Sequence, residues 1–196
     1  MKKYFGLVGE KFRLSAKALS DPKALAVSAM LLAITLVLSY FGNISITLLG
    51  TNVIKLSFTA LPIAVAALLY GPVVAGIIGG LSDIIGFMIA PMGAYIPGFT
   101  VSMILIGFAY GIAFFNEKIS VRRICLIQLI VSLFISVLLG SLWFVLFYGF
   151  QPLQAFSVRG IKELVMYPLN IILIAGMTKV LERIPEMRDI GVSSEK

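Results

Sequence analysis

Five ionisable residues lie in or beside long apolar stretches of the chain. They are Lys55, Asp83, Arg159, Lys162 and Glu163. A charge at membrane depth costs roughly a few kcal/mol, so such groups usually face a cavity or a partner. Arginine can hold a carboxylate with a fork of two N–H donors, and lysine with a point charge. These residues are therefore candidates for binding a charged solute, while structural ion pairing and snorkelling to the membrane surface remain alternatives.

The setting of Asp83 differs from that of the three C-terminal charges. Asp83 interrupts the apolar run 79–86, where it either contacts a ligand or pairs with a lysine or arginine. Arg159, Lys162 and Glu163 follow one another at spacings that place them on neighbouring turns of one helix face. We expect them to open the last helix. Positive charge is unfavourable at a helix N-terminus, so it calls for a negative partner such as a ligand carboxylate.

Aromatic residues occur in the same parts of the sequence as these charges. Tyr95 and Phe99 flank a Pro-Gly loop, and Trp143 and Tyr148 lie near the end of a long apolar run. An interfacial aromatic belt would explain each of them singly. Together with the charges they predict a pocket that stacks a flat ring and clamps an acid, since ligand pockets combine apolar walls with few polar groups.

The composition decides which elements position these residues. Of 196 residues, 60% are hydrophobic and only 13% are charged, and the mean hydropathy is +1.05. Soluble domains are about 45–50% apolar and about 25% charged. The apolar surplus is too large for one small globule, so the chain is predicted to be an integral membrane protein.

Hydropathy predicts an all-α membrane protein with six transmembrane helices in a single domain. The expected spans are 24–41, 53–70, 73–90, 98–115, 121–148 and 160–181. They divide the chain into a basic N-terminal segment (1–23), a six-helix substrate-binding domain (24–184) and a polar tail (185–196). Gly71-Pro72 marks a tight turn between the second and third spans, and Gly149 with Pro152 ends the fifth.

The distribution of basic residues orients the predicted spans. With six spans, all but three of the 16 lysines and arginines lie on the side of the termini. The positive-inside rule then places both termini in the cytoplasm of a multi-pass cell-membrane protein. The N-terminal segment is expected to be an amphipathic helix on the membrane, with Phe12 facing lipid and Lys11 meeting head groups.

Several function classes are disfavoured by what the sequence lacks. It has no histidine and one cysteine, Cys125, so it lacks the commonest general base and metal ligand. We expect no enzymatic activity, no metal and no cofactor. No phosphate-binding P-loop is present, so active import would draw energy from a partner or an ion gradient. The net charge of +7 is attributed to membrane topology rather than to nucleic-acid binding.

Small residues in the first span predict a docking surface. Ala29 and Ala33 are four residues apart, and Ala26 joins them on the same face. Small residues at this spacing allow another helix to approach closely in lipid.

The motifs resemble those of the S components of energy-coupling factor (ECF) transporters, and among them the folate family. The most specific is Gly93-Ala94-Tyr95-Ile96-Pro97-Gly98-Phe99-Thr100. Supporting segments are Ala29-x-x-x-Ala33, 55–63, 70–76, 83–87 and 161–164. The resemblance implies a six-helix protein that binds a vitamin, folate in this family, from outside the cell. It also implies assembly with a transmembrane coupling protein and two cytoplasmic ATPase subunits.

The resemblance also assigns roles to residues. It implies that Ala29 and Ala33 contact the coupling protein and that Arg159 and Lys162 hold the glutamate or pterin end of the vitamin. Family members often carry Asn-Thr-Leu-Trp where this chain has Gly140-Ser141-Leu142-Trp143. That departure leaves another flat B-vitamin or precursor open as the ligand. A stand-alone secondary transporter or channel is the rival from a different class.

Overall fold

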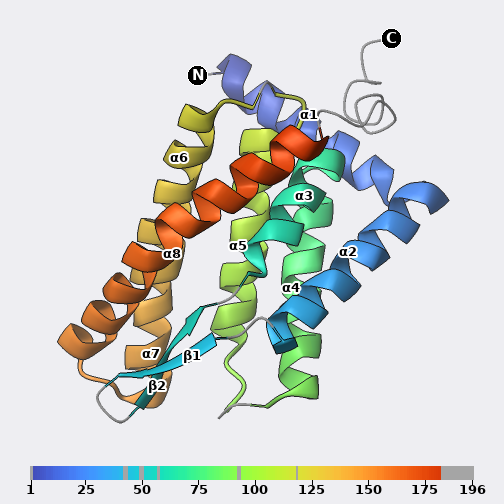
Figure 1. Ribbon diagram of the computed structural model, residues 1–196. Coiled ribbons are helices and arrows are strands. Elements are labelled where there is room, and N and C mark those ends of the chain that lie inside the picture. Colours follow the sequence, from blue (N-terminus) through green and yellow to red (C-terminus); the bar gives the residue numbers. More distant parts are fainter. Residues whose placement is uncertain are drawn as a thin grey trace.

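The computed structural model describes residues 2–41, 44–48, 51–56, 58–91, 94–117 and 119–181. Its elements form a helical bundle with one short hairpin at one end (Figure 1). In chain order they are α1 (Lys2–Ala18), α2 (Pro22–Phe41), β1 (Ile44–Leu48), β2 (Thr51–Leu56), α3 (Ala60–Tyr70), α4 (Pro72–Ile89), α5 (Pro97–Phe114), α6 (Val121–Ile130), η1 (Val131–Leu139), α7 (Gly140–Tyr148) and α8 (Pro152–Leu181). We call the two ends of the bundle the hairpin end and the α1 end.

Within the part of the chain that the structure describes, five helical segments are long and apolar enough to cross a membrane, which confirms a helical membrane protein. They are α2, α4, α5, the continuous run 121–147 and α8. The second predicted span, 53–70, differs from the expectation. Residues Thr51–Leu56 form a strand, and the helix α3 begins only at Ala60. At about 1.5 Å per residue its 11 residues span about half of a bilayer's hydrocarbon core.

The hairpin replaces the start of the predicted second span for a local reason. β1 and β2 pair antiparallel, with Ser45 opposite Lys55 and Ile44 opposite Leu56. The segment is rich in β-branched residues, which favour extended backbone. Hydropathy sums apolar character over a window and does not distinguish a strand from a helix, so it joined the strand to the helix that follows.

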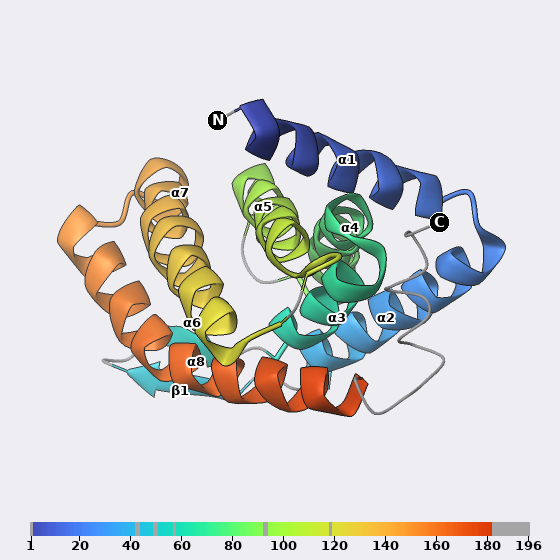
Figure 2. The same ribbon diagram turned by 90° about the horizontal axis from the view of Figure 1, so that it is seen from above.

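Helix α3 lies at the centre of the bundle, where it contacts α2, α4, α5 and α8 (Figure 2). Eight of its residues are buried, among them Ile63, Ala66 and Ala67 with no exposed surface. Beside it, α4 and α5 pack at close range through glycines. A side chain at Gly79 or Gly107 would collide with the backbone of the facing helix. These glycines therefore serve packing within the bundle.

The last two predicted spans are present, with one boundary that matters for the site. The fifth predicted span is the run α6–η1–α7, in which η1 is a π-helix. It ends at Gly149, whose φ of 65° is left-handed. The last helix begins at Pro152 and not at residue 160, because proline is well suited to the first turn of a helix. Arg159, Lys162 and Glu163 therefore lie inside α8 rather than at its opening.

The N-terminal helix α1 packs against the bundle, which corrects the expectation for its side chains. Phe12 makes an edge-to-face contact with Phe108 of α5 at 5.3 Å between ring centroids. Ser15 is fully buried, and its Oγ accepts hydrogen bonds from the backbone N–H groups of Val73 and Val74. The first N–H groups of a helix have no partner within it. Ser15 therefore caps α4, a tertiary contact that no hydrophobic pattern within α1 reveals.

Candidate functional site

The first turn of α5 organises the candidate site at the hairpin end. Pro97 starts this helix, and the N–H of Phe99 donates to the carbonyl of Ile96 in a tight turn. Side chains from three other helices, α4, α7 and α8, contact α5 near this turn. The turn therefore holds predicted site residues from distant parts of the sequence in one region.

A chain of hydrogen bonds runs from α4 to the loop before α5. The hydroxyl of Thr100 donates to Oδ2 of Asp83 at 2.7 Å. The hydroxyls of Tyr95 and Thr100 are 2.6 Å apart. The ring of Tyr95 contacts Phe87 at 5.2 Å between centroids, and 41% of Tyr95 is exposed. Asp83 thus has a hydroxyl partner, and neither of the ion pairs seen in the described part of the chain involves it.

Trp143 lies against the same turn of α5. Its Nε1 donates to Oγ of Ser102 at 3.1 Å, and Ser102 donates to the carbonyl of Gly98 at 3.0 Å. A side chain at Gly98 would overlap the indole ring. Gly98 is therefore required at this position because Trp143 lies directly on the backbone there.

Arg159 packs against two aromatic rings, Phe99 and Phe144, which also contact each other. Its guanidinium carbon is 4.5 Å from the centroid of Phe144 and 5.3 Å from that of Phe99. Such cation–π contacts contribute about 0.5–2 kcal/mol, more when the cation is desolvated. Nη1 donates to the carbonyl of Ser136 at 3.1 Å. Nε is buried without a hydrogen-bond partner among the described residues.

Two local features of the fifth span make room for this guanidinium. Gly140 lies against it, and a Cβ at Gly140 would overlap Nη1 of Arg159. Ser136, whose carbonyl accepts from Arg159, is in the π-helix η1. Short π-helical insertions in α-helices are frequent at functional sites, and η1 extends over nine residues. The backbone here is shaped around the arginine.

For the remaining predicted site residues the structure gives fewer contacts. Lys162 and Glu163 are half-buried on α8. Glu163 lies within Coulombic range of Arg159 and of the buried Tyr110. The side chains of Tyr148 and Lys55 lie outside the described residues, although the backbone of both is described.

Sequence reasoning missed several members of this region. They are Ser102, Ser136 and Phe144, while Thr100 and Gly140 were quoted only as parts of sequence motifs. Thr100 and Ser102 carried a detectable signal, since hydroxyls in an apolar helix require partners. Ser136, Gly140 and Phe144 carried none, because their role depends on the position of Arg159.

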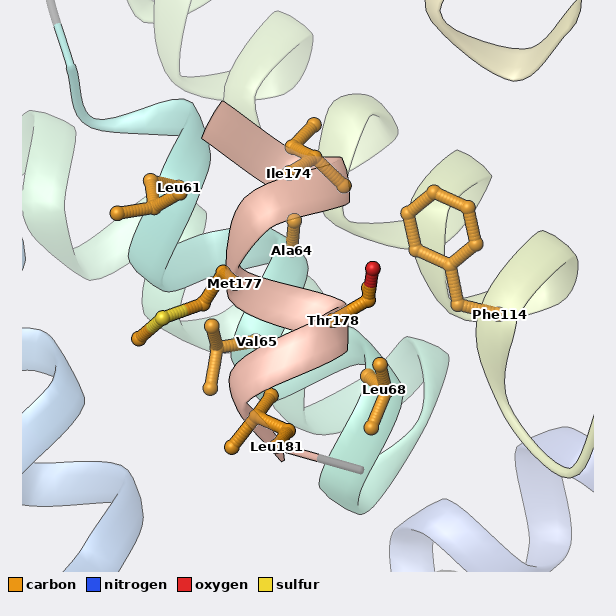
Figure 3. A pocket seen from close by; sticks show the side chains of 9 residues that line it. All are labelled: Leu61, Ala64, Val65, Leu68, Phe114, Ile174, Met177, Thr178 and Leu181. Atoms are coloured by element: carbon orange, nitrogen blue, oxygen red, sulfur yellow. The ribbon is translucent and has the colours of Figure 1, made fainter. Parts of the chain in front are cut away.

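A small apolar pocket lies between α3 and α8, away from this region (Figure 3). Leu61, Ala64, Phe114 and Ile174 are among its walls, and Thr178 is its one polar lining residue. Its cavity volume of about 10 Å³ leaves room for about one water molecule. Without charge and with this volume, it does not hold a vitamin.

The predicted docking residues lie on an exposed face of α2. Ala26, Ala29 and Ala33 are all exposed, whereas Ser28 and Thr35 of the same helix are buried against the bundle. Exposed apolar side chains such as Met30 and Val37 surround the alanines. The face is therefore available to lipid or to another helix.

Comparison with known proteins defines the class of protein. The sequence profile described as "ECF transporter, substrate-specific component" matches residues 23–184. The chain belongs to this family, which confirms the resemblance inferred from its motifs and makes it a transport component rather than an enzyme.

Individual relatives carry a more specific name. The chain is 35% identical over 141 residues to the folate transporter FolT of Clostridium novyi (strain NT), a match covering 72% of this chain and 82% of the relative. It is 31% identical over 157 residues to the folate transporter FolT of Leuconostoc mesenteroides, covering 77% and 82%. Its fold resembles a crystal structure of FolT bound with folic acid, with a TM-score of 0.71, 29% identity, and coverage of 80% of this chain and 93% of that one.

Proposed function

We propose that this chain is the folate-binding S component of an ECF importer and that it captures folate at the hairpin end. The observation that carries the proposal is the placement of Arg159. Its guanidinium lies against the rings of both Phe99 and Phe144, and its buried Nε–H has no partner among the described residues. A buried donor without a partner costs about 1–3 kcal/mol, so a bound acceptor would relieve it. Two relatives named as folate transporters support this choice of solute.

Folate joins a flat pterin ring to a glutamate with two carboxylates, and the site offers groups for both. Trp143, Phe99 and Tyr95 would line the ring, because stacked aromatic faces suit a planar heterocycle. Arg159 and Lys162 would pair with a carboxylate, to which arginine binds with two N–H groups. Glu163 and Tyr148 complete the proposed set, and Asp83 acts within the hydrogen-bond chain described above.

The same proposal covers the membrane arrangement and the partners. Counting the short α3 with the five long helices gives six spans in the domain 24–184, with the segments 1–23 and 185–196 in the cytoplasm. The hairpin end then faces outward. The exposed alanines 26, 29 and 33 of α2 would dock on a transmembrane coupling protein that carries two cytoplasmic ATPase subunits. Lipid covers the rest of the apolar surface.

The test is direct binding to the purified chain without partners or ATP. We expect folic acid to bind tightly in calorimetric titration, with riboflavin, a flat vitamin without carboxylates, as the matched control. Mass spectrometry of small molecules that copurify with the chain identifies the ligand independently. Recovery of a different vitamin or precursor would overturn folate. Uptake by the chain alone in liposomes under an ion gradient would instead support a stand-alone transporter.

A further inference from the structure

We propose that Asp83 is a positioning residue that acts through Thr100 to make the hydroxyl of Tyr95 a hydrogen-bond acceptor toward the solute. This inference rests on the proposed function, since it concerns how the same site selects its ligand. It assigns Asp83 a role other than ion pairing with the ligand or with a basic residue.

The direction of the hydrogen bonds follows from counting protons. An ionised carboxylate has no proton to give, so the 2.7 Å contact makes Thr100 the donor to Asp83. A threonine hydroxyl has one proton, and this contact uses it. The 2.6 Å contact between the hydroxyls of Tyr95 and Thr100 then requires Tyr95 to donate. The single phenolic proton of Tyr95 is thereby also committed.

What remains on Tyr95 is an oxygen that can only accept. A solute group meeting that oxygen must therefore bring an N–H or O–H. The aminopyrimidinone part of a pterin carries an amino group and a ring N–H, which are donors of this kind. A carboxylate would meet only lone pairs there, which directs the acid end of the solute away from Tyr95 and toward basic groups such as Arg159.

Burial and packing keep the hydrogen bonds running from Tyr95 to Thr100 to Asp83. Thr100 is 8% exposed and Asp83 is half-buried within α4, so water has little access to reverse the chain. The phenol ring packs against Phe87, which holds Tyr95 in place. Tyr95 itself is 41% exposed and lies in the loop before α5, so it is accessible to an incoming solute.

The first experiment is a set of binding titrations with folic acid. We expect Tyr95→Phe to weaken binding about 5- to 10-fold, the loss of one hydrogen bond. Asp83→Leu and Thr100→Val, both close in size to the native residue, should weaken it about 2- to 5-fold. Thr100→Ser, which keeps the hydroxyl, should retain the native affinity. Should Asp83→Leu not fold, Thr100→Val with Thr100→Ser carries the same test.

The decisive step repeats two substitutions in the Tyr95→Phe background. Because Asp83 and Thr100 act through the tyrosine hydroxyl, Asp83→Leu and Thr100→Val should have no further effect on affinity there. An equal loss in both backgrounds would overturn the proposal, because Asp83 would then act by direct contact or through the fold.

A second measurement does not depend on which solute binds. The Raman bands of tyrosine report whether its hydroxyl donates or accepts, and the difference between the native chain and Tyr95→Phe isolates Tyr95. We expect a donor signature in the native chain that weakens in Asp83→Leu and Thr100→Val but not in Thr100→Ser. An acceptor signature in the native chain would overturn the inference. If folic acid fails to bind while the donor signature is present, the proposed function fails and the hydrogen-bond direction stands.

Discussion

The two ends of the bundle handle polar groups in opposite ways. At the α1 end, Lys11 donates to Glu117 and to the carbonyl of Ile112, and Arg123 donates to the second oxygen of Glu117. Buried Ser15 has two donors. At the hairpin end, by contrast, the guanidinium of Arg159 has one carbonyl, two aromatic faces and a buried N–H without a partner among the described residues.

This difference distinguishes polar groups that stabilise the fold from polar groups that can bind a solute. A fully paired polar cluster stabilises the ends of the helices that it joins, but it has no remaining capacity for a solute. An incompletely paired buried cation destabilises the empty protein and is stabilised when an acceptor arrives. We therefore expect substitutions at the hairpin end to change affinity and those at the α1 end to change stability.

The largest expected effect follows from replacing Arg159 by methionine, which keeps apolar side-chain volume against Phe99 and Phe144. Losing a charged hydrogen bond should weaken folic acid binding by about 1.5–3 kcal/mol, roughly 10- to 150-fold. Calorimetric titration measures this. Arg122→Met, at an exposed arginine near the α1 end, is the matched control and should bind normally. Unchanged affinity in Arg159→Met would remove this residue from the site.

Gly140→Ala tests whether the space beside the Arg159 guanidinium is needed for binding. The added methyl group would overlap Nη1 and displace the guanidinium, so we expect binding weaker by about 1–2 kcal/mol, comparable to one hydrogen bond. Alanine is favoured over glycine in a helix by about 1 kcal/mol, so the thermal stability should hold or rise. Gly176→Ala, where a Cβ meets nothing within 4 Å, should leave binding unchanged. Native affinity in Gly140→Ala would show that the guanidinium position is not required.

At the α1 end, Ser15→Ala removes the hydroxyl that accepts from Val73 and Val74. By analogy with lost helix caps, we expect a free energy of unfolding lower by about 0.5–2 kcal/mol. Thermal unfolding in detergent measures this, with the exposed Ser20→Ala as control. Folic acid affinity should not change, and a large loss of affinity would break the division between the two ends.

The smallest effect concerns pH. Hydrogen bonds from Arg123 and Lys11 lower the pKa of Glu117 below its ordinary value of 4.5. A lowered folded pKa means that the stabilisation is present above the unfolded pKa and is lost as the pH falls through the folded one. Glu117 and its two partners, Lys11 and Arg123, are partly exposed, so we expect this cluster to contribute at most about 1 kcal/mol to stability. The melting temperature of the native chain should exceed that of Glu117→Gln near neutral pH, and the gap should narrow and then close as the pH falls below 4.5 and through the lowered pKa of Glu117. A gap independent of pH would contradict this role.

Much of the site could be predicted because it is encoded locally. The run from Gly93 to Thr100 contains the proline, glycine and aromatic residues of one turn. Four residues of this run make contacts in the site: Tyr95, Gly98, Phe99 and Thr100. Arg159 stood out because a charge in an apolar helix requires an explanation. The roles of Gly140 and Ser136 could not be predicted, because each depends on a guanidinium about 20 residues away along the chain.

The sequence by itself determined that the protein lies in a lipid bilayer, and it determined where the chain turns at proline and glycine. Apolar character adds up along a segment, and proline and glycine restrict the backbone where they stand, so neither requires knowledge of a distant neighbour. The tertiary structure alone decided that Ser15 caps α4, that the second apolar segment divides into a strand and a helix, and that Asp83 pairs with Thr100. Hydrogen bonds and close packing depend on distances between atoms, and only the folded chain sets those distances.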